Sequence, residues 1–125
     1  MRAFVLTNVS STACAVQGWP AVKLVLQSGQ VISPSVRLFH YDSSGAPNHV
    51  LQPRAITLQP RSVATFLLFD QDWNYKANKA CARIRAMLVT PPGADTRLVV
   101  PKGLGQYCAP LNVGPLVPGL SPRYP

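Results

Sequence analysis

The chain has 125 residues, 47% of them apolar, and carries a formal net charge of +8. This length and apolar fraction indicate a single globular domain and exclude a disordered chain. Thirteen prolines and the lack of any glutamate leave little room for helices. No apolar run approaches the roughly 18 residues of a transmembrane helix.

Short segments rich in Val, Leu, Ile and aromatic residues follow one another along the chain, separated by Pro, Gly, Asn and Ser. This spacing predicts β-strands divided by turns. The expected strands cover residues 2–9, 13–17, 22–27, 31–32, 37–41 (an edge strand), 55–58, 62–69, 81–89, 96–100 and 111–117. Segment 62–69 is apolar on both faces, as expected of a central strand.

The clearest alternation lies in segment 81–89, where Arg83 and Arg85 interrupt a row of apolar side chains. Successive side chains of a strand point to opposite faces, so the apolar row is expected to face the core. The expected core combines this row with apolar residues of other strands: Ile84, Ala86, Leu88, Leu58, Phe66 and Leu24. The turn at 90–95 predicts a hairpin between this strand and segment 96–100.

The predicted fold class is all-β, an Ig-like antiparallel β-sandwich of about seven or eight short strands. The sandwich domain is expected to span residues 1–117. The proline-rich residues 118–125 are expected to form a tail.

The chain carries a series of short motifs: Leu6-Thr7-Asn8, Cys14-Ala15-Val16-Gln17-Gly18-Trp19-Pro20, Thr57-Leu58-Gln59-Pro60-Arg61-Ser62-Val63-Ala64, Leu88-Val89-Thr90-Pro91-Pro92-Gly93, Leu98-Val99-Val100-Pro101 and Cys108. Together, and in this order, they resemble an uncharacterised domain of actinobacterial secreted proteins and lipoproteins, domain of unknown function 4232. The resemblance covers about residues 3–117, and its most specific part is the cysteine-to-proline motif.

The resemblance implies a secreted β-sandwich of unknown role, and it carries over no catalytic residue. Members usually begin with a further strand that bears an early cysteine, behind a signal peptide or lipid-anchor site. In this chain Met1 falls just before what would be the second strand. We therefore expect the first strand to be missing. Residues 1–6 are too short for the apolar region of a signal peptide.

The three cysteines, Cys14, Cys81 and Cys108, fit no CxxC zinc spacing. Cys81 begins the predicted strand 81–89, and Cys108 precedes the predicted strand 111–117, the second one after it. A disulfide between the two cysteines is therefore geometrically reasonable. It would stabilise the fold by about 3 kcal/mol. Cys14 would then be an unpaired thiol. The alternative is that all three are buried free thiols of a cytosolic domain.

Arg83 and Arg85, with Arg97 on the neighbouring strand, are a candidate basic sheet face. The other basic residues are scattered singly and the aromatic residues are not interleaved with them, so nucleic acid is not the expected partner. Diffuse positive charge suits an anionic envelope polymer or a lipid surface. A soluble domain whose charge has no specific partner is the plainer alternative.

Three further motifs predict no chemistry. Residues 70–74 begin like a calcium loop but lack its glycine and its final glutamate, so a solvated turn is expected. His40, Asp42 and His49 share one predicted loop, yet no G-x-S-x-G motif supplies a nucleophile. Asn8-Val9-Ser10 is a glycosylation triplet, which arises often by chance.

We expect no catalytic, cofactor or metal site. The expected function is a non-catalytic structural or binding module of the cell envelope, extracellular by the resemblance. The rival interpretation is a cytosolic basic binding protein with free thiols, whose ligand is an anion or nucleic acid.

Overall fold

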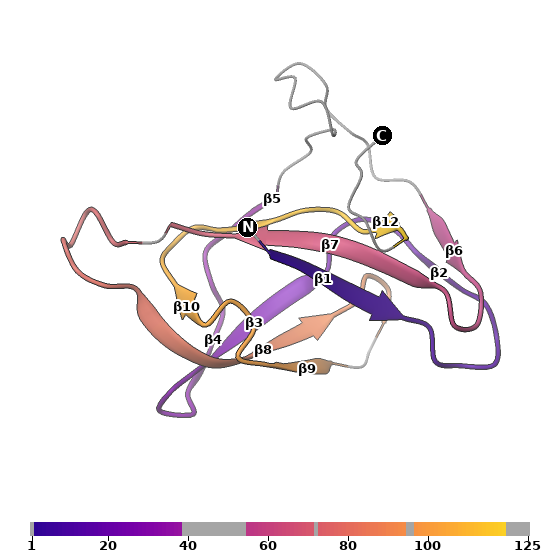
Figure 1. Cartoon of the computed structure of the whole chain (residues 1–125), viewed down its shortest axis with the longest axis horizontal. Helices are drawn as coiled ribbons and strands as arrows, with labels where there is room; N and C mark the ends of the chain where they lie inside the picture. Colours follow the sequence, from indigo (N-terminus) through magenta and orange to yellow (C-terminus); the bar gives the residue numbers. More distant parts are fainter. Residues whose placement is uncertain (1, 39–54, 72, 95–96, 120–125) are drawn as a thin grey trace, which may run out of the picture.

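The computed structural model describes residues 2–38, 55–71, 73–94 and 97–119. In these ranges the chain forms strands and no helix, which confirms the all-β prediction (Figure 1). The strands are β1 (Arg2–Thr7), β2 (Cys14–Val16), β3 (Ala21–Leu26), β4 (Val31–Ile32), β5 (Val36–Leu38), β6 (Ile56–Leu58), β7 (Val63–Phe69), β8 (Ala82–Thr90), β9 (Leu98–Pro101), β10 (Gln106–Tyr107), β11 (Leu111–Val113) and β12 (Val117–Pro118).

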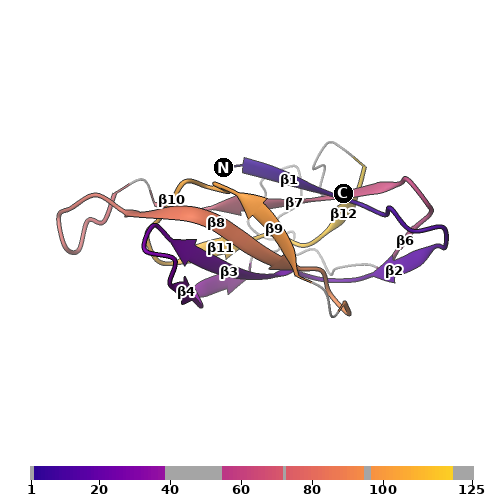
Figure 2. The ribbon, with the colours of Figure 1, turned by 90° about the horizontal axis from the view of Figure 1, so that it is seen from below.

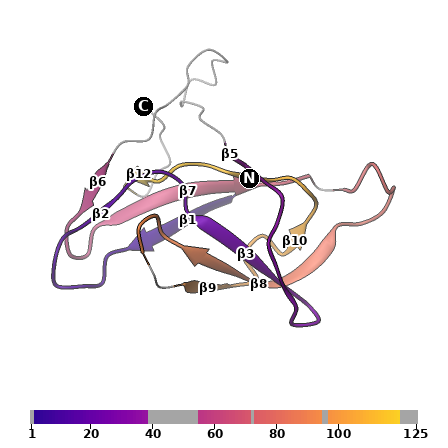
Figure 3. The same cartoon turned by 180° about the vertical axis from the view of Figure 1, so that it is seen from behind.

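The strands form two facing sheets, which confirms the predicted β-sandwich (Figure 1). The first sheet has the order β1-β7-β11-β5, and β12 also pairs with β7. The second has the order β10-β8-β3-β4, and β9 also pairs with β8; it lies in front in Figure 2. Strands β2 and β6 make a separate pair at the end of the sandwich opposite β10 (Figures 1 and 3). The β11–β5 pair is parallel and the other pairs are antiparallel.

Strand β7 is the centre of the first sheet, as its two apolar faces predict. Residues 64–68 are all buried, because β1, β11 and β12 pair with the strand along its length. Phe66 and Leu68 belong to the core between the sheets, and the ring of Phe66 stacks on that of Phe4 with 5.7 Å between centroids. Leu67 points to the opposite face and packs with Val117.

The core between the sheets draws on both layers and confirms four of the six expected members, Leu24, Leu58, Phe66 and Ile84. The expectation was wrong for Ala86 and Leu88, which are only half-buried. Their neighbours Met87 and Val89 are fully buried instead.

A β-bulge at Arg85 explains the difference. Ala86 pairs with Val25, but Ile84 pairs with the next residue of β3, Leu26, so Arg85 is an extra residue on β8. An extra residue in one strand reverses which side chains face inward beyond that point. The strict alternation read from the sequence therefore holds only up to the bulge.

Strands β9 and β10 both pair with this edge of β8 and are separated by a loop that lies beside Arg85. Between β9 and β10 the chain turns through Lys102 and Gly103, both with positive φ, and the Lys102 N–H donates a hydrogen bond of 2.9 Å to the Arg85 carbonyl. A β-carbon on Gly103 would lie 2.3 Å from Cγ of Met87. Only glycine therefore lets this loop lie directly on the Met87 side chain.

The described domain extends slightly past residue 117. Pro118 belongs to β12, and the Gly119 N–H donates to the Val63 carbonyl at 3.1 Å. The remainder of the predicted tail lies outside the described residues. Within the described ranges no helix has the length and apolar character needed to cross a membrane.

Candidate functional site

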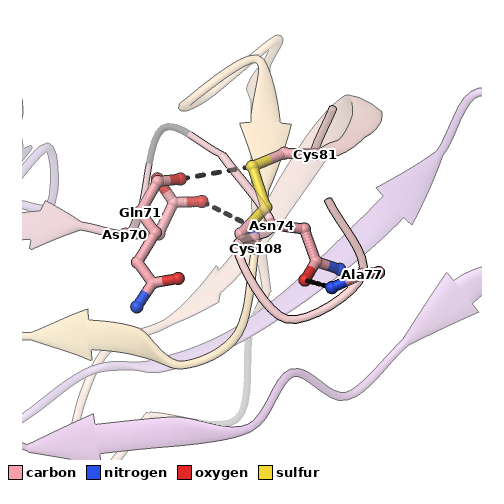
Figure 4. The surroundings of a disulfide bond; sticks show 6 residues. All are labelled: Asp70, Gln71, Asn74, Ala77, Cys81 and Cys108. Carbon is pink, nitrogen blue, oxygen red and sulfur yellow. Dashed lines mark hydrogen bonds between the residues drawn. A yellow bond between two sulfur atoms is a disulfide. The ribbon is translucent and has the colours of Figure 1, made fainter. Parts of the chain in front are cut away.

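A disulfide closes the end of the sandwich at which β8 begins (Figure 4). Cys81 immediately precedes β8 and Cys108 immediately follows β10, and these two strands pair antiparallel through Tyr107 and Ala82. The pairing brings the two α-carbons to 5.0 Å, within the range that a disulfide requires. Both cysteines are buried, so the bond is shielded from solvent.

The end of β7 packs against this disulfide and connects it to the first sheet. The Cys108 N–H donates a hydrogen bond of 2.9 Å to Oδ2 of Asp70, and the Cys81 sulfur lies 3.2 Å from the Gln71 carbonyl oxygen (Figure 4). A carboxylate that accepts a backbone N–H makes a strong, charge-assisted bond. The disulfide, Asp70 and Gln71 therefore fix the ends of β7, β8 and β10 relative to one another.

An open groove with a volume of about 430 Å³ runs beside the disulfide. We call it the basic groove, because the charged residues in its described lining, Arg83 and Lys102, are both cationic. The residues that line it are Gln27, Ala80, Cys81, Arg83, Ile84, Lys102, Gly105 and Gln106.

Three structural elements bring these cations together. Arg83 stands on β8 opposite Gln106 of β10, and Lys102 belongs to the loop that joins β9 to β10. The Ile84 N–H donates to the Gly105 carbonyl at 3.1 Å, which holds that loop against β8. Residues that carry a guanidinium, an ammonium and a side-chain amide thus line one open space. Such donors suit a phosphate or carboxylate group.

The structure separates the residues of the predicted basic face. Arg83 lines the groove, and the exposed Arg85 stands at the bulge beside Lys102. Arg97 precedes Leu98, which pairs with Val89 near the opposite end of β8. Val89 is six positions further along the strand than Arg83, a span of about 20 Å. The geometry groups Arg83 with Lys102 and not with Arg97.

The sequence reasoning missed Lys102, Gln27 and Gln106. The signal for Lys102 was its place in a glycine-containing stretch directly after a strand predicted to pair with 81–89. A loop after strand 96–100 is expected to lie beside the start of strand 81–89, because the two strands were predicted to pair. Gln27 reaches the groove only through the pairing of β3 with β8, a long-range contact that no local pattern shows.

The remaining candidate residues lie elsewhere. Cys14 is a free, exposed thiol on β2. His40, Asp42 and His49 of the predicted loop lie outside the described residues, as does Asp72 of the calcium-like segment. No group of three potential metal ligands gathers within the described part of the chain.

Asn8 of the glycosylation triplet is buried. Its side chain donates to the carbonyls of Thr12 and Leu58 and accepts from Ser10. A side-chain amide committed to these bonds is not presented for modification.

Comparison with known proteins identifies the family. Residues 2–117 match the family described as domain of unknown function, DUF4232. Neither the curated proteins nor the solved structures contain a match to the chain. Because the matched region covers nearly the whole chain, this β-sandwich belongs to the DUF4232 family.

Proposed function

We propose that the protein is a non-catalytic binding module of the cell envelope, which binds phosphate-bearing anionic polymers in the basic groove. The observation that carries the proposal is the convergence of Arg83 and Lys102 on one open space beside Gln106. Guanidinium and ammonium groups are the side chains that proteins use most for phosphate. The groove is open to solvent and not enclosed, whereas sites for small ligands usually bury most of the ligand surface.

The charge of the surroundings supports an anionic ligand. Asp70 is the sole acidic residue in the described part of the chain, and its Oδ2 accepts the bond from Cys108 N–H. The net charge of +8 adds a long-range attraction that accelerates the approach of an anion.

The envelope location rests on the disulfide. Bonds between cysteines form and persist in oxidising compartments and are rare in the cytosol. A free-thiol titration of protein purified without reductant tests this location. We expect one reactive thiol per chain, that of Cys14, under denaturing conditions. Three thiols per chain would favour the rival cytosolic protein.

The non-catalytic role rests on the chemistry of the groove lining. Among the described residues that line the groove there is no carboxylate, no histidine and no free thiol, since the Cys81 sulfur is in the disulfide. Acid–base and nucleophilic catalysis usually depend on such groups. The groove can attract and orient an anion, and binding is the activity that it supports best.

Titration calorimetry with long-chain inorganic polyphosphate tests the proposal. We expect Arg83→Gln and Lys102→Gln each to weaken binding about tenfold, because each removes one charge-assisted contact. Arg97→Gln is the matched control, since it removes the same charge about 20 Å from the groove. We expect it to change the affinity less than twofold. An equal loss for Arg83→Gln and Arg97→Gln would mean that diffuse charge, and not the groove, binds the polymer.

A further inference from the structure

The chain from Trp73 to Ala80 projects from the disulfide end of the sandwich as a loop, which we call the aromatic loop (Figures 1 and 2). It exposes two aromatic side chains, Trp73 at 38% and Tyr75 at 73%. Lys76 and Lys79 are exposed on the same loop. Large aromatic side chains are usually buried, so two of them on one projecting loop indicate a contact surface.

The aromatic loop is ordered by its own hydrogen bonds. Asn74 and Lys79 form a β-bridge, in which each backbone N–H donates to the other residue's carbonyl, at 2.9 and 3.2 Å. The side-chain oxygen of Asn74 also accepts from the Ala77 N–H at 3.0 Å (Figure 4). Directly after the loop, Cys81 enters the disulfide. The aromatic side chains are therefore presented on a preorganised support, which lowers the entropy lost on binding.

The loop and the basic groove adjoin each other. Ala80, the last residue of the loop, lines the groove together with Cys81. A partner that covers the loop and extends past Ala80 therefore reaches the groove. The shared surface presents two aromatic rings and the cations of Lys76, Lys79, Arg83 and Lys102.

This combination matches the chemistry of a bilayer interface. Trp and Tyr concentrate at the headgroup level of membranes, because each has an apolar ring and a polar group. Lysines near the surface are attracted to anionic lipids. A hydrated polymer would need only the cations, whereas the exposed rings of Trp73 and Tyr75 gain most from a partly apolar partner.

We propose that this end of the protein docks on a bilayer of anionic phospholipid. Trp73 and Tyr75 enter the interfacial layer, Lys76 and Lys79 contact the headgroups, and a headgroup phosphate occupies the basic groove. The last of these contacts rests on the proposed function of the groove, whereas the loop contacts do not.

Co-sedimentation with lipid vesicles tests the proposal, with phosphatidylglycerol and phosphatidylcholine mixed in one set and phosphatidylcholine alone in the other. We expect binding to the anionic vesicles at least tenfold tighter than to the neutral ones. The double variant Trp73→Ser with Tyr75→Ser should bind the anionic vesicles at least tenfold more weakly. Val9→Ser is the matched control, because Val9 is 77% exposed and follows Asn8, whose side chain bonds to Leu58 of β6 at the opposite end of the sandwich. It should bind like the wild type.

Tryptophan fluorescence gives an independent readout. The chain has two tryptophans, and Trp19 packs against the core, so Trp73 should report contact with lipid. We expect the emission to shift to shorter wavelength when anionic vesicles are added. Trp73→Phe should abolish the shift.

The outcomes separate the loop from the groove. Loss of vesicle binding in the loop double variant, with polyphosphate affinity unchanged, supports the membrane proposal. Wild-type protein that binds polyphosphate but no vesicles overturns it and leaves the polymer as the ligand. Vesicle binding that the loop double variant retains in full also overturns it. If vesicle binding needs the loop while wild-type protein fails to bind polyphosphate, the proposed groove function fails and the loop contact stands.

Discussion

The two ends of the sandwich are closed by different means. At the end with β2 and β6, the buried Asn8 side chain donates hydrogen bonds of 2.9 Å to the Thr12 carbonyl and 2.8 Å to the Leu58 carbonyl. Its oxygen accepts from both the backbone and the hydroxyl of Ser10. At the other end the covalent bond between Cys81 and Cys108 takes this role. One end is closed by a polar network and the other by a disulfide.

Both ends also carry a hollow of similar size, and the two differ in charge. The basic groove has a volume of about 430 Å³ and two cations, Arg83 and Lys102. The hollow between β6, β7 and β12 has a volume of about 390 Å³, and among the described residues that line it Arg61 is the one cation. Volume therefore does not distinguish them, and the arrangement of donors does.

The comparison shows how the fold separates stability from binding. At the Asn8 end the side-chain amide of Asn8 is fully engaged in hydrogen bonds within the protein. At the disulfide end the covalent bond supplies the constraint, so Arg83, Lys102 and Tyr75 can face solvent. Variants at the two ends should accordingly change different properties.

Met87→Ala should have the largest effect on the disulfide end. Met87 is fully buried beneath the loop that carries Lys102, so we expect a loss of about 2–5 kcal/mol in the free energy of unfolding. The half-buried Leu88 is the matched control, and Leu88→Ala should lose about 1 kcal/mol. Urea unfolding followed by fluorescence measures both. A larger loss for Leu88→Ala than for Met87→Ala would mean that β8 alternates without a bulge at Arg85.

Removal of the disulfide should come next. The combined change Cys81→Ala with Cys108→Ala opens a loop with a sequence separation of 27 residues. We expect a loss of about 3–4 kcal/mol from the entropy gained by the unfolded chain. Cys14→Ala, at an exposed thiol, should stay within about 0.5 kcal/mol of wild type. Non-reducing peptide mapping that links Cys14 to either partner would contradict the pairing.

Asn8→Ala tests the polar end. It leaves the carbonyls of Leu58 and Thr12 without the amide donor, which should lower the unfolding free energy by about 1–3 kcal/mol. Val9→Ala, at a residue 77% exposed, is the neighbouring control and should have little effect. Polyphosphate affinity should be the same for both variants. A weakened affinity for Asn8→Ala would show that the two ends are coupled.

Most of the strands could be predicted from the sequence, because prolines and glycines mark their ends and apolar residues fill them. The pairing of Cys81 with Cys108 could also be predicted, since each cysteine flanks a predicted strand and the two strands were expected to lie close together. The bulge at Arg85 could not. Residues 86–89 are apolar at every position, so either register buries two apolar side chains. The loop on the neighbouring strand decides between them, and that contact is not local.

The candidate site was predictable only in part for the same reason. Arg83 was recognised from its own strand, but its partner Lys102 comes from a different one. Arg97 was grouped with Arg83 because it lies on the neighbouring predicted strand. In the observed register Leu98 pairs with Val89, which places Arg97 near the far end of β8. The binding surface depends on strand pairing and loop position, which charge patterns do not encode.

The smallest expected effect is a gain in stability at Arg61. The Ser62 N–H donates to the Gln59 carbonyl at 2.9 Å, which closes a tight turn with Pro60 second and Arg61 third. Arg61 has a φ of 72°. In a turn of this geometry, glycine is the residue that usually occupies the third position, because the φ there is positive.

Arg61→Gly should therefore relieve about 1–2 kcal/mol of steric strain. The same change should lower the unfolding free energy by about 0.5–1 kcal/mol, because glycine has greater conformational freedom in the unfolded chain. The net gain should be about 0.5 kcal/mol by urea unfolding. The bond from the Arg61 N–H to the Asn8 carbonyl, at 2.7 Å, comes from the backbone and should survive the change.

Because Arg61 lines the hollow at the Asn8 end and not the basic groove, polyphosphate affinity should stay within about twofold of wild type, a difference of roughly 0.4 kcal/mol. A destabilised variant would show that the Arg61 side chain makes a contact worth more than the strain of its backbone. A tenfold weaker affinity would move the anion site to the Asn8 end.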